Sequence, residues 1–353
     1  MDWNNMDVLE RDFEDISLSN VDFGQLSDKK VMITGATGLI GSLLVKSLLY
    51  CNDKYNLGIK IVACVRNKQK AQSVFGDLVG KNVELCISDL CDGIIEYDGQ
   101  VDYIIHTASV TNSKMMVTKP VDTALIALRG TNAVLEYAVK NNVGSVIYLS
   151  SMEVYGQVGT SEKIAENTLG YVDLKNPRSC YPEGKRMCEC LCTAYAYQYD
   201  LNVKIARLAQ TFGAGIAREE NRVFAQFAKS VINNQDIVLH TTGQSEGNYV
   251  YTSDAIVAIL TVLLKGEKGE AYNVSNEESH MKIIDMAKMV ANDVANGKIK
   301  VVLDIPDDAL KFGYAPDTKT WLDASKLRNL GWSAKVSLRE AYMRTIRWLR
   351  GLG

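Results

Sequence analysis

Thr34-Gly35-Ala36-Thr37-Gly38-Leu39-Ile40-Gly41 is the stretch that decides the fold. It follows an apolar run at 31–34 and precedes an amphipathic stretch at 42–50. Between a strand and a helix, the first glycine permits a tight turn, the second lets the backbone approach a pyrophosphate, and the third allows close helix–sheet packing. The helix N-terminus would face the phosphates. This stretch therefore predicts a dinucleotide-binding turn, with contacts from Gly35, Thr37, Gly38, Leu39, Ile40 and Gly41.

Short β-branched runs alternate with longer amphipathic stretches on the C-terminal side of this turn. Parallel strands need long crossovers and become buried on both faces, which this rhythm fits. We therefore expect the α/β class, with a Rossmann-type, doubly wound parallel sheet. The six expected strands are 31–34, 60–65, 83–87, 103–107, 145–150 and 203–208, and the main helices are 42–50, 68–75, 121–140 and 182–199.

The rhythm breaks after Thr211, and this break suggests the domain boundaries. Residues 29–212 are expected to form the NAD(P)-binding domain, to which 249–265 returns. The remainder of 213–353 has a mixed pattern and is expected to be mainly a smaller α/β substrate lobe. Residues 1–28 are acidic with a loose helical pattern, which predicts an N-terminal helical extension.

Charge and composition narrow the function classes. The 353 residues carry 39 Lys and Arg against 42 Asp and Glu, with no long basic run, so a nucleic-acid partner is not expected. The N-terminus is acidic and no apolar stretch approaches the roughly 18–20 residues of a membrane span. Eight cysteines lack paired zinc-type spacing and only three histidines occur. We expect a cytoplasmic protein with reduced thiols, no membrane contact and no metal site.

The end of the second expected strand bears on the cofactor. NAD-specific proteins commonly place an acidic residue there, which binds the ribose and repels a 2′-phosphate. Here Arg66 occupies this place and Lys68 follows shortly after. The pattern favours NADP over NAD, although Arg66 at a strand end is also compatible with a simple solvated side chain.

Three residues predict the catalytic chemistry. Ser151 ends a strand, and Tyr181 and Lys185 lie one helical turn apart on one face. A lysine ammonium near a tyrosine lowers its pKa and lets the phenolate act as a base. Ser151 would hold an alcohol or carbonyl oxygen during hydride transfer to a nicotinamide.

With these motifs together, the chain resembles an extended short-chain dehydrogenase/reductase of the NAD-dependent epimerase/dehydratase family over residues 30–350. The G-x-x-G-x-x-G spacing is typical of that superfamily, and 180–186 with Glu153 is most similar to UDP-glucuronate decarboxylases. The resemblance implies oxidation of a nucleotide-sugar at C4, followed by reaction of the 4-keto intermediate. The matching segments are 34–41, 106–109, 119–120, 130–131, 150–156, 181–186, 207–208, 211–213, 251–254 and 330–332.

The resemblance also implies further contacts and a homodimer. Relatives pair the helices at 121–140 and 182–199 into a four-helix interface, although the apolar faces of these helices could equally be core. The implied cofactor contacts are Asp89, Leu90, Thr107, Ala108 and Ser109, in addition to Arg66, Tyr181 and Lys185. The implied substrate contacts are Ser109, Met152, Gln210, Arg222 and Tyr249.

Glu153 and its neighbour bear on the sub-reaction. In the dehydratases that this segment resembles, the glutamate takes the C5 proton and an adjacent aspartate protonates the leaving C6 hydroxyl. Met152 cannot donate that proton, whereas decarboxylation and 4-epimerisation do not need it. These two reactions are therefore favoured, and Glu153 would act on the intermediate or orient the sugar.

Other positions depart from the family pattern. Ala127 and Gln210 each stand where the family commonly has an asparagine, and Gly247 stands where decarboxylases carry a diphosphate-binding arginine. Arg222 is the first candidate to replace that arginine and Arg218 the second. Two alternative functions stay open: an NADPH-dependent carbonyl reductase of the same fold, favoured by Arg66, and a non-catalytic nucleotide-sensing protein.

Overall fold

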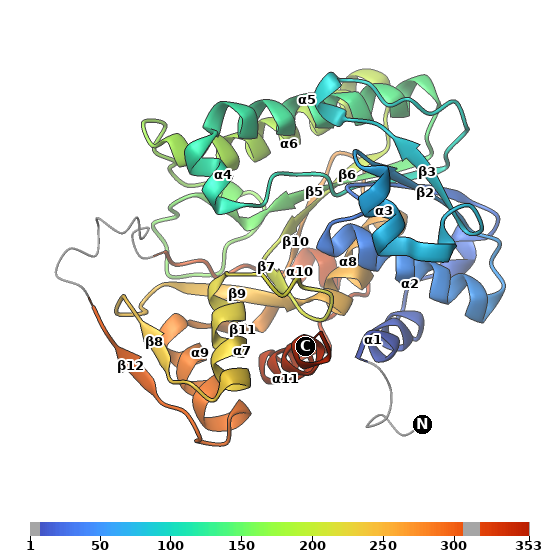
Figure 1. The fold of residues 1–353 in the computed structure, drawn as a ribbon. Helices are drawn as coiled ribbons and strands as arrows, with labels where there is room; N and C mark the ends of the chain where they lie inside the picture. Colours follow the sequence, from blue (N-terminus) through green and yellow to red (C-terminus); the bar gives the residue numbers. More distant parts are fainter. Residues whose placement is uncertain (1–7, 306–317, 353) are drawn as a thin grey trace.

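The computed structural model describes residues 8–305 and 318–352, and a seven-stranded sheet lies at its centre (Figure 1). The strand order is β10-β6-β5-β4-β1-β2-β3, and every neighbouring pair is parallel. The predicted Rossmann-type α/β fold is therefore confirmed. The strands are β1 (Lys30–Thr34), β2 (Lys60–Val65), β3 (Val83–Ile87), β4 (Tyr103–His106), β5 (Ser145–Ser151), β6 (Val203–Leu208) and β10 (Ala271–Val274).

Helices cover both faces of this sheet. One face packs against α2 (Leu39–Tyr55), α3 (Lys68–Phe75) and α8 (Thr252–Lys265). The other face packs against α5 (Pro120–Lys140) and α6 (Cys180–Tyr199), which α4 (Ser113–Thr118) precedes. Successive strand residues face opposite layers, so Ile33 lies in the first core and Met32 in the second. Burial on both faces explains the apolar strand runs.

The strand β10 differs from the sequence-based expectation. The segment 272–274 was expected in the C-terminal lobe, but β10 pairs with β6 at the edge of the central sheet. Of the segment 249–265, which was expected to return to the first domain, α8 packs on the central sheet, whereas 249–251 pair in the separate three-stranded sheet. A single sequence pattern does not reveal which sheet a short strand joins, because pairing is decided by the chain path after α8.

The C-terminal lobe has its own core (Figure 1, lower left). A three-stranded sheet of β11-β9-β7 and a parallel β12-β8 pair pack with helices around Phe212 and Tyr342. The strands are β7 (Gln210–Phe212), β8 (Ile237–Leu239), β9 (Glu246–Tyr251), β11 (Asn276–Lys282) and β12 (Val301–Leu303). The helices are α7 (Val223–Asn233), α9 (Ile283–Met289) and α11 (Leu338–Gly351). The short helix α10 (Ser325–Arg328) lies outside this core and packs beside β10 of the central sheet.

The expected N-terminal helix is present as α1 (Val8–Ser17), and the first seven residues of the extension lie outside the described part of the chain. It packs against α2, α8 and α11. The buried Asp12 carboxylate accepts hydrogen bonds from the Tyr251 hydroxyl at 2.8 Å and from Arg344 at 2.6 Å. The extension is thus joined to both lobes.

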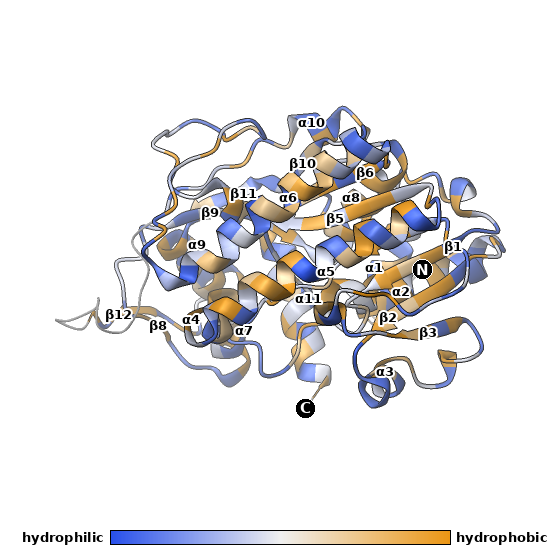
Figure 2. Ribbon diagram, turned by 90° about the horizontal axis from the view of Figure 1, so that it is seen from above, coloured by the Kyte–Doolittle hydropathy of each residue, from blue (hydrophilic) through white to orange (hydrophobic). Residues whose placement is uncertain are grey.

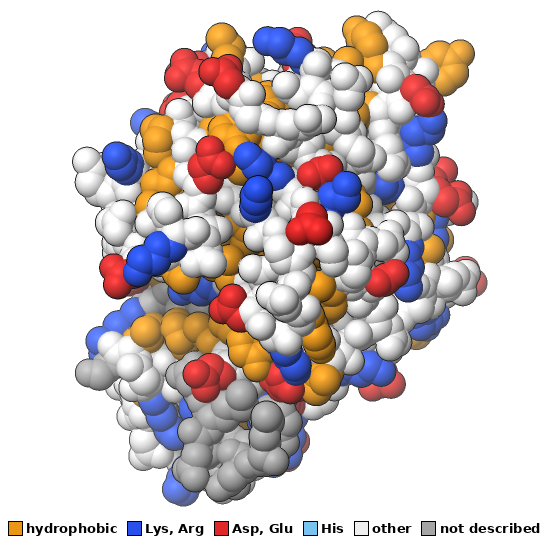
Figure 3. All heavy atoms as spheres, turned by 90° about the vertical axis from the view of Figure 1, so that its right-hand side faces the viewer, with side chains coloured by type: hydrophobic (Ala, Val, Ile, Leu, Met, Phe, Trp, Pro, Cys, Tyr) orange, Lys and Arg blue, Asp and Glu red, His pale blue; other side chains and the backbone are white. Residues whose placement is uncertain are grey.

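Two surface observations complete the description. Among the described residues, no helix has the length and apolar character needed to cross a membrane. On the described part of the face shown in Figure 3, Lys and Arg side chains are interspersed with Asp and Glu.

Candidate functional site

A cleft of about 750 Å³ lies where the carboxyl ends of β1, β2, β4 and β5 face the N-terminus of α7. Ligands of doubly wound sheets bind at this edge. The structure brings nearly all of the predicted site residues to this cleft: Gly35, Thr37, Gly38, Leu39, Ile40, Gly41, Arg66, Asp89, Leu90, Thr107, Ala108, Ser109, Ser151, Met152, Glu153, Tyr181, Lys185, Gln210 and Arg222.

The glycine-rich turn has the shape that a dinucleotide needs. Gly35 has a φ of 64°, and a Cβ on it would lie 2.8 Å from the Ala108 backbone. A Cβ on Gly41 would lie 2.4 Å from the carbonyl oxygen of Gly35. Only glycine fits at these two positions without a shift of backbone. The helix α2 begins directly after Gly38, so its first N–H groups open into the cleft.

A second observation fits a bound cofactor. The Ser150 hydroxyl is buried, lines the cleft and has no hydrogen-bond partner among the described residues. A buried hydroxyl without a partner is unfavourable unless a ligand or water satisfies it. The turn and this hydroxyl together are consistent with a dinucleotide in the cleft.

The end of the cleft at Arg66 and Asp89, which we call the adenosine end, carries both basic and acidic side chains. Asp89 accepts a hydrogen bond from the Cys91 N–H at 3.0 Å, and that bond, with the nearby Arg66 charge, lowers the pKa of the Asp89 carboxyl. Arg66 is exposed at the end of β2. Lys70 lines the cleft, whereas Lys68 is not among the lining residues. The lysine that adds to the charge of Arg66 here is therefore Lys70.

Ser151, Tyr181 and Lys185 come together as predicted. Ser151 at the end of β5 lies close enough to Tyr181 to lower its pKa, and its hydroxyl caps the following turn by accepting from the Glu153 N–H at 3.2 Å. Lys185 is buried, and its Nζ donates to the Leu149 carbonyl at 2.7 Å. Burial lowers the pKa of Lys185 to about 8.

The electrostatics of Tyr181 differ from the expectation. Lys185 was expected to lower the tyrosine pKa, but burial raises the pKa of Tyr181 to about 12. Lys185 Nζ lies 5.9 Å from the centre of the Tyr181 ring. The charges that lower this pKa come from Arg178 and Arg222, and the Glu153 carboxylate acts in the opposite direction. Burial exceeds these effects in the protein without ligands.

Arg178 is a cleft residue that sequence reasoning missed. Its Nη1 and Nη2 donate to the two oxygens of Glu153 at 2.6 and 2.9 Å. Arg178 precedes Tyr181 by three residues, where the short helix Pro177–Ser179 runs into α6. A basic residue one turn before a candidate catalytic tyrosine is the sequence signal that could have identified it.

Comparison with known proteins gives the family. A family model described as "NAD dependent epimerase/dehydratase family" matches residues 31–275. The chain belongs to this family. The predicted resemblance and enzyme class are confirmed by this membership, and the carbonyl reductase and the nucleotide-sensing protein are correspondingly disfavoured.

The curated relatives share low identity over most of their length. The chain is 27% identical to dTDP-D-glucose 4,6-dehydratase of Bos taurus over 336 residues, covering 91% of this chain and 89% of the relative. It is 28% identical to UDP-glucuronic acid decarboxylase 1 of Xenopus tropicalis over 324 residues, covering 91% and 72%.

Solved structures show the same fold. UDP-glucose 4-epimerase of Thermotoga maritima superposes with a TM-score of 0.76 at 21% identity, covering 92% of this chain and 99% of that one. UDP-glucuronic acid 4-epimerase of Bacillus cereus, solved with UDP-glucuronic acid and NAD, superposes with a TM-score of 0.72 at 21% identity, covering 92% and 100%.

Within this epimerase/dehydratase member, the wall opposite the glycine-rich turn is apolar and cationic. Met115, Met116 and Ile126 line it with Met152, and sequence reasoning did not identify the first three. Arg222 occupies the N-cap position of α7, and its side chain pairs with Glu220 at 2.7 Å.

Two predicted substrate contacts lie elsewhere. Tyr249 was expected to touch substrate, but its side chain is buried in the core of the C-terminal lobe, with its ring edge-on to Phe212 at 6.1 Å. Its position on β9 points it inward, away from the cleft. Arg218, the second candidate for the diphosphate, is exposed, lies outside the cleft lining and donates to the Leu352 carbonyl at 3.4 Å.

His106 lines the cleft but has a structural environment. It is buried between the hydroxyls of Thr34 and Thr131, at 2.7 and 3.3 Å. Burial lowers the pKa of its imidazole to about 3. His106 is therefore neutral and bridges β1 to α5.

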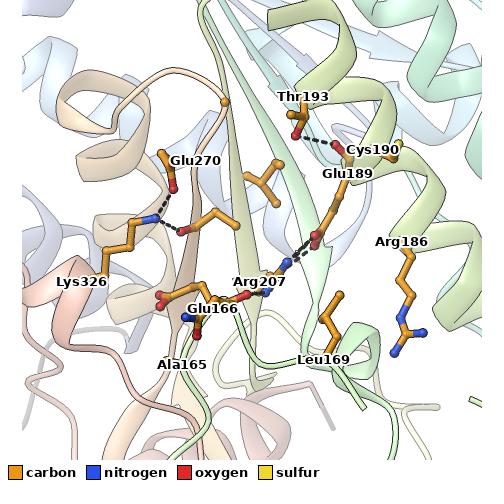
Figure 4. A pocket seen from close by; sticks show the side chains of 14 residues that line it. Ala165, Glu166, Leu169, Arg186, Glu189, Cys190, Thr193, Arg207, Glu270 and Lys326 are labelled. Carbon is orange, nitrogen blue, oxygen red and sulfur yellow. Dashed lines mark hydrogen bonds and ion pairs between the residues drawn. The ribbon is translucent and has the colours of Figure 1, made fainter. Parts of the chain in front are cut away.

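A second hollow of about 630 Å³ lies beside α6, β6 and β10 (Figure 4). Its charged side chains are paired with each other. Arg207 and Glu189 point toward one another and are joined at 2.6 Å, and Lys326 pairs with Glu270 at 2.5 Å. Arg207 also donates to Tyr155 and to the backbone of Glu166. These pairs hold α6 and α10 against the sheet edge.

The cysteines are all free thiols, and the buried Cys188 and Cys192 pack in the core under α6. Among residues 8–305 and 318–352, no group of His, Cys, Asp and Glu side chains is arranged to hold a metal ion.

Proposed function

We propose that this family member oxidises the C4 hydroxyl of a nucleotide-linked sugar and acts on the resulting 4-keto sugar. The observation that carries the proposal is the meeting of Ser151, Tyr181 and Lys185 in the cleft that begins at the glycine-rich turn. The family description and the names of the relatives support the same chemistry.

The side chains divide the work as follows. Tyr181, as phenolate, takes the proton from the C4 hydroxyl, and the Ser151 hydroxyl donates a hydrogen bond to the same oxygen. A bound NAD(P)⁺ would supply the hydride acceptor for C4, and its positive charge would favour the phenolate. The bond to the Leu149 carbonyl holds Lys185 in the wall of the cleft. The glycine-rich turn and Ser150 would hold the cofactor.

Met152, the residue before Glu153, supports 4-epimerisation or decarboxylation over loss of the C6 hydroxyl. Elimination needs a proton donor beside the leaving oxygen, and Met152 offers only a thioether. Glu153 lines the cleft with Ser151 and Tyr181, where it acts on the 4-keto intermediate or orients the sugar. Ser109, Met152, Gln210 and Arg222 complete the proposed substrate contacts.

For the cofactor, we propose NADP in preference to NAD. Arg66 and Lys70 both line the adenosine end and are exposed, so they can pair with a 2′-phosphate. Asp89 and Leu90, with Thr107, Ala108 and Ser109, would contact the remainder of the dinucleotide.

We also propose a homodimer through α5 and α6, which lie side by side on one face (Figure 2). Val121, Leu125 and Leu128 follow helical spacing on α5, and Met187, Leu191, Tyr195 and Tyr199 follow it on α6. Four of these seven side chains are exposed. An apolar stripe over two helices fits burial against a second copy.

A cytoplasmic location is proposed from the free cysteines.

The test is incubation of the purified protein with UDP-, dTDP-, GDP- and CDP-sugars without added reductant, followed by mass and retention analysis. An isobaric product identifies a 4-epimerase and loss of carbon dioxide a decarboxylase. Loss of water would contradict the argument from Met152. Reaction only after addition of NADPH and a carbonyl compound would overturn the proposal.

A further inference from the structure

The proposed chemistry gives the guanidinium of Arg178 no contact with substrate. It is partly exposed in the same cleft as Tyr181 and Met152, and it is close enough to Tyr181 to influence its pKa. Two of its N–H groups bind the two oxygens of Glu153. An arginine has five such donors, and no further partner of this guanidinium is found in the part of the chain that the structure describes.

Sugar geometry relates this guanidinium to one substituent. In a hexopyranose the C6 group is carried by C5, which is bonded directly to C4. If the C4 oxygen sits at Ser151 and Tyr181, the C6 group must lie within a few bond lengths of them. Met152, Glu153 and Arg178 are the cleft side chains that lie next to this pair in the fold, on the turns directly after β5 and before α6.

We propose that Arg178 binds the C6 carboxylate of a nucleotide-linked uronic acid and thereby selects uronates over neutral hexoses. This inference rests on the proposed C4 chemistry and names its substrate class. Guanidinium–carboxylate contacts are short, charge-assisted and geometrically specific. A neutral hydroxymethyl group offers no such partner, and Met152 offers it no proton donor.

The contact with Glu153 prepares Arg178 for this role. The two-pronged ion pair holds the planar guanidinium in one orientation, so less side-chain freedom is lost when a second carboxylate binds. The charge at this end of the cleft also fits. This end is lined by three cations, Lys185, Arg178 and Arg222, and by the Glu153 carboxylate. Glu220 lies beside it and pairs with Arg222. The three cations exceed the two carboxylates by one charge, so this end favours an anionic substrate group.

The experiment compares dissociation constants for UDP-glucuronate and UDP-glucose, measured calorimetrically on the NADP-loaded protein, with steady-state KM and kcat. The variants are Arg178→Gln and Arg178→Lys. The control is Lys175→Gln, which removes an exposed charge three residues away, outside the cleft lining.

In the wild type we expect UDP-glucuronate to bind at least tenfold more tightly than UDP-glucose. In Arg178→Gln the ratio of the two constants should fall about 10- to 100-fold, with KM rising more than kcat falls. Arg178→Lys should recover part of the preference, and Lys175→Gln all of it.

The outcomes separate the two proposals. If the wild type converts no nucleotide-sugar, the proposed function fails. If it converts UDP-glucose and binds both sugars equally, the function stands and the role of Arg178 is overturned. An equal loss of both affinities in Arg178→Gln also overturns it, because that result indicates support of Glu153 alone. Should Arg178→Gln not fold, the wild-type preference and Arg178→Lys still decide.

Discussion

At the scale of single residues, the environment of Tyr181 is opposed to its proposed role until a ligand binds. Burial raises its pKa to about 12, while Arg178 and Arg222 provide the opposing charges. A base that is neutral in the free protein becomes active only when further positive charge enters the cleft. The proposed base would therefore be activated by cofactor binding.

Removal of the Tyr181 hydroxyl tests this role. We expect Tyr181→Phe to lower kcat about 10²- to 10⁴-fold, since general-base catalysis contributes that range. NADP binding and the melting temperature should change little. The control is Tyr342→Phe, which removes a buried hydroxyl that has no partner among the described residues, in the core of the C-terminal lobe and outside the cleft lining. Unchanged turnover in Tyr181→Phe would remove Tyr181 from the mechanism.

Lys185 predicts a pH-dependent stability. Its pKa falls from 10.5 to about 8 on folding, so the folded state holds fewer protons than the unfolded state between these values. The resulting destabilisation is complete below pH 8 and declines as the pH rises from 8 toward 10.5. Lys185→Met should raise the free energy of unfolding by on the order of 1–3 kcal/mol at pH 7, while turnover is lost.

Urea unfolding of both proteins at pH 7 and pH 10 checks this, and the difference between them should shrink at the higher pH. Lys204→Met is the matched control. Burial also lowers the pKa of Lys204 to about 8, but it binds Ser145 on the sheet edge away from the cleft. It should show the same stability trend with turnover retained. A constant difference at both pH values would contradict the account.

At the scale of elements, the close packing of α2 against the β1–α2 turn predicts that a larger residue at Gly41 destabilises the fold. In Gly41→Ala, the new methyl group would meet the Gly35 carbonyl oxygen and the Ala36 Cα. We expect a loss of about 1–3 kcal/mol of stability and weaker NADP binding, because α2 must move from the turn. Gly247→Ala is the control, since nothing lies within 4 Å of its added Cβ. Equal effects of the two changes, by thermal melting and by cofactor titration, would contradict this.

The elements also show what sequence patterns can reveal. The strands at 60–65, 83–87 and 203–208 and the helix at 68–75 have the expected bounds, because apolar strand runs and the Asn67 cap leave strong local patterns. Helix ends were less accurate: α2 continues to Tyr55, past the expected end at Tyr50, through a polar last turn. The placement of β10 and the inward side of Tyr249 depend on distant pairing.

The candidate site divides in the same way. Glycines and the Ser151, Tyr181 and Lys185 set carry spacing rules, so they could be read from the chain. The Glu153–Arg178 pair and the methionines of α4 have no such rule, since their meeting depends on how two loops close over one cleft.

At the scale of the whole molecule, Arg344 on α11 joins the N-terminal helix to the C-terminal lobe. It is mostly buried and pairs with Asp12 and Asp15 at 2.6 and 2.7 Å. Arg344→Met would leave the buried Asp12 carboxylate without its cation, so we expect a loss of about 3–5 kcal/mol in chemical unfolding. Arg347→Met, an exposed arginine on the same helix, is the control and should change stability by less than about 0.5 kcal/mol. Comparable effects of both variants would show that α1 is only loosely attached.

Assembly is the last property that the whole molecule predicts. Met187 on α6 is 47% exposed and lies in the apolar stripe proposed to meet a second copy. If that stripe is an interface, the wild type should sediment at twice the chain mass of 39.0 kDa. Met187→Glu should then shift it toward the monomer, because the interface would bury a carboxylate without a partner. The helix would keep its structure, since glutamate is a good helix former. Ile94→Glu changes a comparably exposed apolar residue outside both helices and should leave the mass unchanged. A monomeric wild type, or a dimer that Met187→Glu does not dissociate, would contradict the proposed interface. If Met187→Glu dissociates the dimer but still binds the cofactor, the cleft is complete within one chain.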